Sequence, residues 1–93
     1  MKEVGIRELG EKVKESRQAP LRVGATVDPH RRAGEYKKDY SETDTMFYAK
    51  TKNMNLAENQ LLEKCNERKG CSLNDHKRSN APASEGYVYA IFP

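Results

Sequence analysis

The residues best suited to chemistry lie just after an apolar stretch near residue 25. Four cations, Arg31, Arg32, Lys37 and Lys38, surround the carboxylate of Glu35. Guanidinium and ammonium groups gathered in this way bind phosphates, so the cluster favours contact with nucleic acid. A solvated basic face accounts for the charges at least as well.

A second basic cluster lies further along the chain, at Lys64, Arg68, Lys69, Lys77 and Arg78. The two clusters could contact one nucleic acid if the fold brings them together. The whole chain carries 17 lysines and arginines against 14 acidic residues, and a net charge of +3 is weak evidence by itself.

Cys65, Cys71, His30 and His76 are the residues that suggest a transition-metal site. The spacing between the cysteines is wider than in most zinc sites, and the sequence has no second cysteine pair. We therefore expect no zinc. Cys65 falls on the apolar stripe of a predicted helix and should be buried, and we expect both cysteines to be free thiols.

Length and composition limit the elements that can position these groups. A chain of 93 residues, 35% hydrophobic and 33% charged, should form one domain with a small core. No apolar segment approaches the roughly 20 residues that cross a bilayer, and residues 1–16 lack the apolar segment of a signal peptide. We expect an intracellular monomer, cytoplasmic or nuclear, that does not bind membranes.

Hydrophobic periodicity predicts helices and strands in alternation. Helices are expected at 2–17, from Asp28-Pro29 to about Tyr40, and at 55–68; strands are expected at 21–27, 45–51 and 87–92. The predicted fold is therefore α/β (α+β), a small, mostly antiparallel three-stranded sheet with flanking helices in the order α-β-α-β-α-β. Residues 70–85 should form a long polar loop. Asp28 and Asn53 each follow a threonine by two residues, which indicates one strand-to-helix turn used twice.

The segment LRVGATVDPHRRAGEY, residues 21–36, resembles the second motif of the GIY-YIG nuclease superfamily. That motif has a strand with the pattern aromatic-aliphatic-Gly, a polar Thr and Asp/Asn turn, and a helix that carries an essential arginine. Gly24, Thr26 and Asp28 match it, and Arg32 stands where that arginine is expected. Tyr36 falls one helical turn later, where the family often has His or Tyr.

The resemblance implies a site for phosphodiester cleavage. Arg32 would clamp the phosphate, and Tyr36 would take part in proton transfer. The segment LAENQLL looks like the family's metal-binding helix, which would make Glu58 the ligand of Mg²⁺ or Mn²⁺. Further phosphate contacts would come from Arg22, Arg31, Lys37 and Lys38.

Two family tyrosines do not stand in their usual places. The first is missing from Gly5-Ile6-Arg7, and Arg22 occupies the position of the second motif's aromatic residue. The C-terminal segment GYVYAI looks like the missing first strand moved to the other end of the chain. A permuted domain is expected, in which this strand lies antiparallel beside residues 21–27 and Tyr87 or Tyr89 points toward Arg32.

Two functions from different classes follow. The first is a divergent GIY-YIG-like domain that binds nucleic acid, with metal-dependent cleavage less favoured than binding because of the displaced tyrosines. The second is a non-catalytic protein-interaction or structural domain. In that case Glu58 is an acidic residue favoured near the start of a helix, and Tyr36 and Tyr40 face the core.

Overall fold

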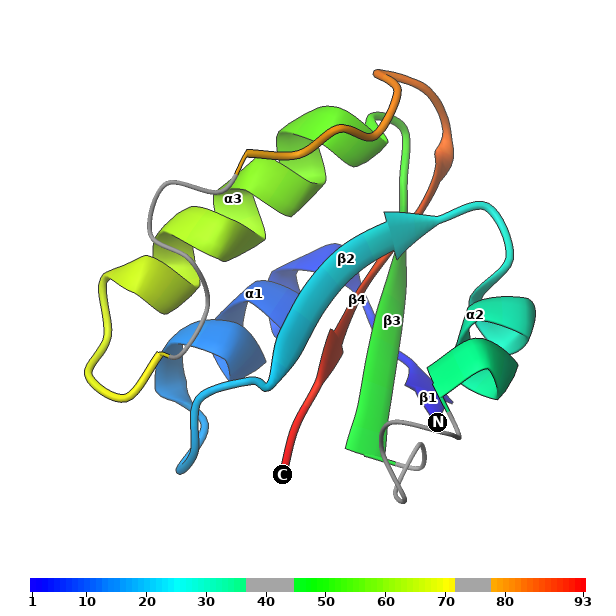
Figure 1. The fold of residues 1–93 in the computed structure, drawn as a ribbon. Coiled ribbons are helices and arrows are strands. Elements are labelled where there is room, and N and C mark those ends of the chain that lie inside the picture. The colour runs from blue at the N-terminus through cyan, green and yellow to red at the C-terminus, as the bar shows by residue number, and fades with distance from the viewer. Residues whose placement is uncertain (37–44, 72–77) are drawn as a thin grey trace.

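The computed structural model describes residues 1–36, 45–71 and 78–93 (Figure 1). Its elements are β1 (Lys2–Glu3), α1 (Ile6–Glu15), β2 (Arg22–Thr26), α2 (Pro29–Tyr36), β3 (Met46–Thr51), α3 (Met54–Asn66) and β4 (Gly86–Ile91). The strands form one sheet in the order β1-β3-β4-β2. Strand β4 is antiparallel to both of its neighbours, and β1 is parallel to β3. The α+β class and the mostly antiparallel sheet are confirmed.

The sheet has four strands, and the prediction of three was wrong at the N-terminus. Lys2 and Glu3 pair with β3, and the N–H of Val4 donates to the carbonyl of Tyr48 at 2.8 Å. Gly5 has an extended backbone and precedes the first turn of α1, so the helix begins at Ile6 instead of residue 2. A two-residue strand is too short to leave a periodic signal, so its charges looked like those of the helix.

The helices cover both faces of the sheet, with α1 and α3 on one face and α2 on the other (Figure 1). Successive residues of a strand point to opposite faces, which divides β4 between two small cores. Val88 and Ala90 pack toward α1 and α3, while Tyr89 and Ile91 pack toward α2.

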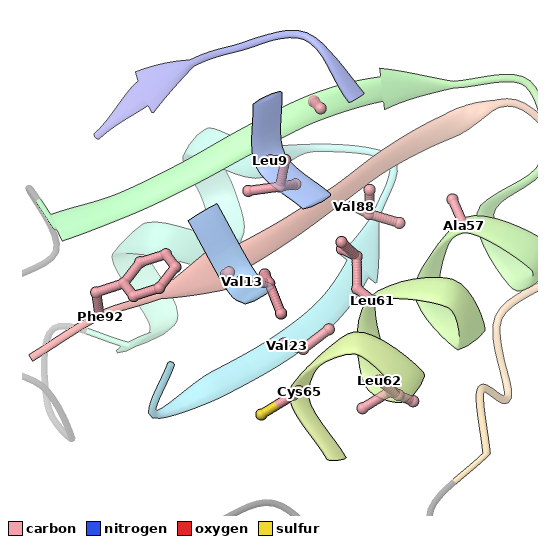
Figure 2. Packing of buried hydrophobic residues seen from close by; sticks show 11 residues of the cluster. Leu9, Val13, Val23, Ala57, Leu61, Leu62, Cys65, Val88 and Phe92 are labelled. Carbon is pink, nitrogen blue, oxygen red and sulfur yellow. The ribbon is translucent and has the colours of Figure 1, made fainter. Parts of the chain in front are cut away.

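The larger core lies between the sheet and the helices α1 and α3 (Figure 2). Leu9 and Val13, one turn apart on α1, meet Leu61 of α3 over Val23 and Val88. Each of these side chains is almost fully buried. Burial of one such side chain contributes about 1.5–3 kcal/mol, so this layer fixes the position of β2 and β4.

The two strand-to-helix turns use the same hydrogen bonds, as the sequence predicted. The N–H of Asp28 donates to the hydroxyl of Thr26 at 3.1 Å, and the Asp28 carboxylate accepts from the N–H of Arg31. The N–H of Asn53 donates to Thr51 at 3.2 Å, and the Asn53 side chain caps α3. In both turns, a side-chain cap therefore fixes where the following helix begins.

The cysteines form a disulfide bond between Cys65 and Cys71, so the prediction of free thiols was wrong. Gly70 has a φ of +85°, and the chain reverses at this glycine just after α3. The reversal brings the two Cα atoms to 5.7 Å, within the range that a disulfide needs. Cys65 is buried, as its place on the apolar stripe predicted.

Among the residues that the structure describes, no helix combines the length and the apolar character that a membrane span requires.

Candidate nucleic-acid site

Strand β4 lies antiparallel beside β2, the arrangement that a permuted domain requires. Gly24 stands directly opposite Tyr89 in the register of the two strands. The hydroxyl oxygens of Tyr89 and Tyr36 are 2.7 Å apart, so β4 brings its tyrosine to the helix that carries Arg32. Tyr87 instead packs edge-on against Tyr48. Of the two tyrosines in β4, Tyr89 is therefore the one that points toward α2 and Arg32.

Gly24 is needed because the Tyr89 ring crosses it. A Cβ built on Gly24 would lie within 3 Å of three atoms of the Tyr89 ring and hydroxyl. Real Cβ atoms essentially never approach other atoms so closely. The glycine of the VGAT segment therefore makes the space in which Tyr89 reaches Tyr36.

Two guanidinium groups flank the tyrosine pair. Arg22 donates from Nε to the hydroxyl of Tyr36 at 3.0 Å, and its guanidinium carbon lies 5.5 Å from the centre of the Tyr36 ring. The guanidinium of Arg32 lies 6.0 Å from the same ring and makes an ion pair with Glu35 at 3.2 Å. Arg22, at the position where the GIY-YIG motif that this segment resembles has an aromatic residue, is thus a cation hydrogen-bonded to Tyr36.

A pocket of about 360 Å³ joins these groups to α3 across β2, one of the two edge strands of the described sheet. Five of the predicted site residues line it: Arg22, Arg32, Tyr36, Glu58 and Tyr89. Arg31 is not among its lining residues, because its largely exposed side chain extends along α2 to Glu35 at 3.7 Å. Lys37 and Lys38 lie outside the described residues.

The phenol of Tyr89 is held in its neutral form. Burial raises the pKa of Tyr89 well above its ordinary value, and the hydrogen bond with Tyr36 raises it further. The positive charges of Arg32 and Arg22 act in the opposite direction and do not compensate. In the folded chain Tyr89 is therefore a hydrogen-bonding group rather than a phenolate base.

Glu58 contributes the carboxylate of the pocket. Its residue is 7% exposed, and its Oε1 accepts a hydrogen bond from the hydroxyl of Ser79 at 2.6 Å. Within residues 1–36, 45–71 and 78–93, no group of three or more His, Cys, Asp and Glu side chains could hold a metal ion together. Glu58 is the only acidic side chain among the described residues that line the pocket, so a cation there would have one protein carboxylate.

Asn80, which sequence reasoning missed, also lines the pocket, and so does Arg78, which it named only as a member of the second basic cluster. Both fall in the segment predicted as a long polar loop. No pattern in the sequence indicates this placement, which depends on hydrogen bonds from Asn55 and Asn59 of α3 to the segment.

The second basic cluster does not form one patch with the pocket. Arg78 is its member there, while Arg68 turns inward and donates to the carbonyl of Val13 at 2.9 Å and to the hydroxyl of Ser16 at 3.2 Å. Lys77 lies outside the described residues. Of the second basic cluster, Arg78 alone among the described residues lies at the pocket beside the first cluster.

Comparison with known proteins gives no match: no family model, curated protein or solved structure is similar to this chain. The likeness to GIY-YIG nucleases therefore rests on the residues themselves and on the place that β4 takes beside β2.

Proposed function

We propose that this chain is a permuted, divergent GIY-YIG-like domain that binds nucleic acid, holding a phosphodiester at the pocket beside β2. The convergence of the predicted residues supports the proposal most directly. Arg22, Arg32, Tyr36 and Glu58 come from three elements, and Tyr89 comes from the last strand of the chain, yet all five line one pocket.

The charges and donors of the pocket suit a phosphate. Arg22 and Arg32 each present a planar fork of N–H groups, which matches two phosphate oxygens. The hydroxyls of Tyr36 and Tyr89, paired at 2.7 Å, add polar groups within the same pocket. Guanidinium contacts to phosphate give affinity that depends on salt and carries little sequence preference.

A divalent cation fits the pocket at Glu58. Mg²⁺ in nucleic-acid enzymes is commonly held by one or two carboxylates, with substrate phosphate and waters completing its shell. Glu58 offers one oxygen, because the other accepts from Ser79. When bound, Mg²⁺ or Mn²⁺ would neutralise phosphate charge and lower the pKa of a bound water.

Replacing Arg32 with alanine should weaken binding of a short DNA by about tenfold or more at low salt, since charged hydrogen bonds contribute about 1.5–3 kcal/mol. The slope of log affinity against log salt concentration should become less steep by the amount that corresponds to about one phosphate contact. Fluorescence anisotropy with duplex and single-stranded DNA measures both quantities. Arg31→Ala is the matched control, because Arg31 neighbours Arg32 on α2 but does not line the pocket.

Loss of affinity that is equal in the Arg31 and Arg32 variants would show that the pocket is not the binding site. If neither form of DNA shifts the amide NMR signals of residues 22–36, the proposal is wrong. The segment is then a strand-turn-helix of an interaction or structural domain.

Replacing Glu58 with glutamine should weaken Mn²⁺ binding at least tenfold, because the amide removes the charge while keeping the shape of the side chain. Paramagnetic broadening of the amide signals around residue 58 measures this without any cleavage assay. Exposed Glu63→Gln, on the same helix, is the control. Equal broadening in wild type and Glu58→Gln would exclude Glu58 as the cation ligand.

A further inference from the structure

Residues 78–84, here named the strap, run along α3 beside the pocket (Figure 1, orange). The side chain of Asn55 donates to the carbonyls of Ser79 at 3.3 Å and Ala81 at 3.1 Å. The N–H of Ser79 donates to the side chain of Asn59 at 2.9 Å. Two asparagines on one face of α3 thus fix the path of the strap.

Ser79 connects the strap to the pocket itself. Its hydroxyl donates its single proton to Glu58 and accepts from the N–H of Ala81 at 3.0 Å. The donor and one acceptor position of this hydroxyl are therefore both used. Since Ser79 is fixed in this way, its two neighbours, Arg78 and Asn80, are held at the pocket wall.

The strap adds positive charge on the side of the pocket away from α2. Arg22, Arg32 and Arg78 bring three guanidinium groups to the lining, against the carboxylate of Glu58. Arg78 is exposed, and none of the ion pairs among the described residues involves it. A nucleic-acid strand repeats its charge at every nucleotide, so a second cationic side of the pocket suits a neighbouring phosphate.

We infer that Arg78 and Asn80 bind the nucleic-acid strand on the α3 side of the phosphodiester held by Arg22 and Arg32. The inference rests on the proposed function and extends it to a second phosphate. Arg78 contacts that phosphate, and the amide of Asn80, which can donate and accept, contacts the adjoining sugar or base edge. Ser79 is a positioning residue, since it acts through Arg78 and Asn80.

Replacing Arg78 with alanine should lower affinity for single-stranded DNA about fivefold at low salt. The salt slope should fall by about 0.7, the value for one phosphate contact on a single strand. Arg7→Ala, an exposed arginine on α1, is the matched control and should leave both quantities unchanged. Urea unfolding of each variant shows that the fold is intact.

Ser79→Ala separates positioning from charge. This change should weaken binding of DNA while leaving the number of charges unaltered. The double variant Arg78→Ala/Ser79→Ala should have an affinity within twofold of that of Arg78→Ala alone. Full additivity of the two changes would show that Ser79 does not act through Arg78.

The outcomes distinguish this inference from the function on which it rests. If Arg32→Ala weakens binding and Arg78→Ala behaves like Arg7→Ala, the pocket binds nucleic acid without the strap, and this inference is overturned alone. If wild-type protein binds no DNA at low salt, both are overturned.

Discussion

Replacing Gly24 with alanine is expected to lower the free energy of unfolding by about 3 kcal/mol. The new Cβ would overlap the ring of Tyr89, and overpacking of this kind costs about 1–3 kcal/mol. Tyr89 would also have to leave Tyr36, and loss of a buried hydrogen bond costs about 1–3 kcal/mol. Urea unfolding followed by circular dichroism measures the change.

Gly34→Ala is the matched control for this substitution. Gly34 lies inside α2, and a Cβ there meets no other atom within 4 Å. Alanine should stabilise the helix at this position by about 0.5–1 kcal/mol. In a Tyr89→Leu background, Gly24→Ala should cost less than in wild type. An equal cost in both backgrounds would show that the ring of Tyr89 does not set the need for glycine.

Replacing Arg68 with alanine should lower the free energy of unfolding by about 2 kcal/mol. The guanidinium of Arg68 donates to the carbonyls of Val13 and Ser16 and to the hydroxyl of Ser16, all at the C-terminal end of α1. The last carbonyls of a helix have no hydrogen-bond donor within that helix. Arg68, just after the end of α3, supplies donors to those at the end of α1. Loss of these bonds removes a connection between the two helices that cover one face of the sheet.

Arg68→Lys and Lys69→Ala test this explanation. Lysine keeps the charge but has no planar fork, so it should recover less than half of the lost free energy. Lys69 is exposed next to Arg68, and its replacement should change stability by less than about 0.5 kcal/mol. Full recovery by lysine would mean that charge near the helix ends, rather than the hydrogen bonds, carries the effect.

The elements that the sequence predicted well are those set by local chemistry. Asp28 and Pro29 start α2, and Asn53 caps α3, because a cap acts within a few residues of itself. The alternation of residues in β2 is also local, because it depends only on the strand having one buried face. Arg32 and Glu58 could be placed on their helices for the same reason.

The features that sequence reasoning missed depend on contacts between distant parts of the chain. The two-residue strand β1 exists because β3 offers it an edge. The disulfide needs the chain reversal at Gly70, and the strap needs Asn55 and Asn59 to bind it. None of these leaves a periodic signal. Residues 78–84 contain no helix or strand, as expected of a polar loop, but the sequence does not show that they are attached to α3.

The position of β4 in the middle of the sheet also determines when this protein can acquire its structure. Tyr36 and Tyr89 are separated by 53 residues, and β2 and β3 contact each other in the sheet only through β4. Pairings between distant segments must overcome the entropy of closing long loops, which slows folding. Without residues 86–91, β2 has no partner strand, and pairing within the sheet is limited to β1 and β3. The pocket lined by Tyr36 and Tyr89 therefore forms only when β4 pairs with β2.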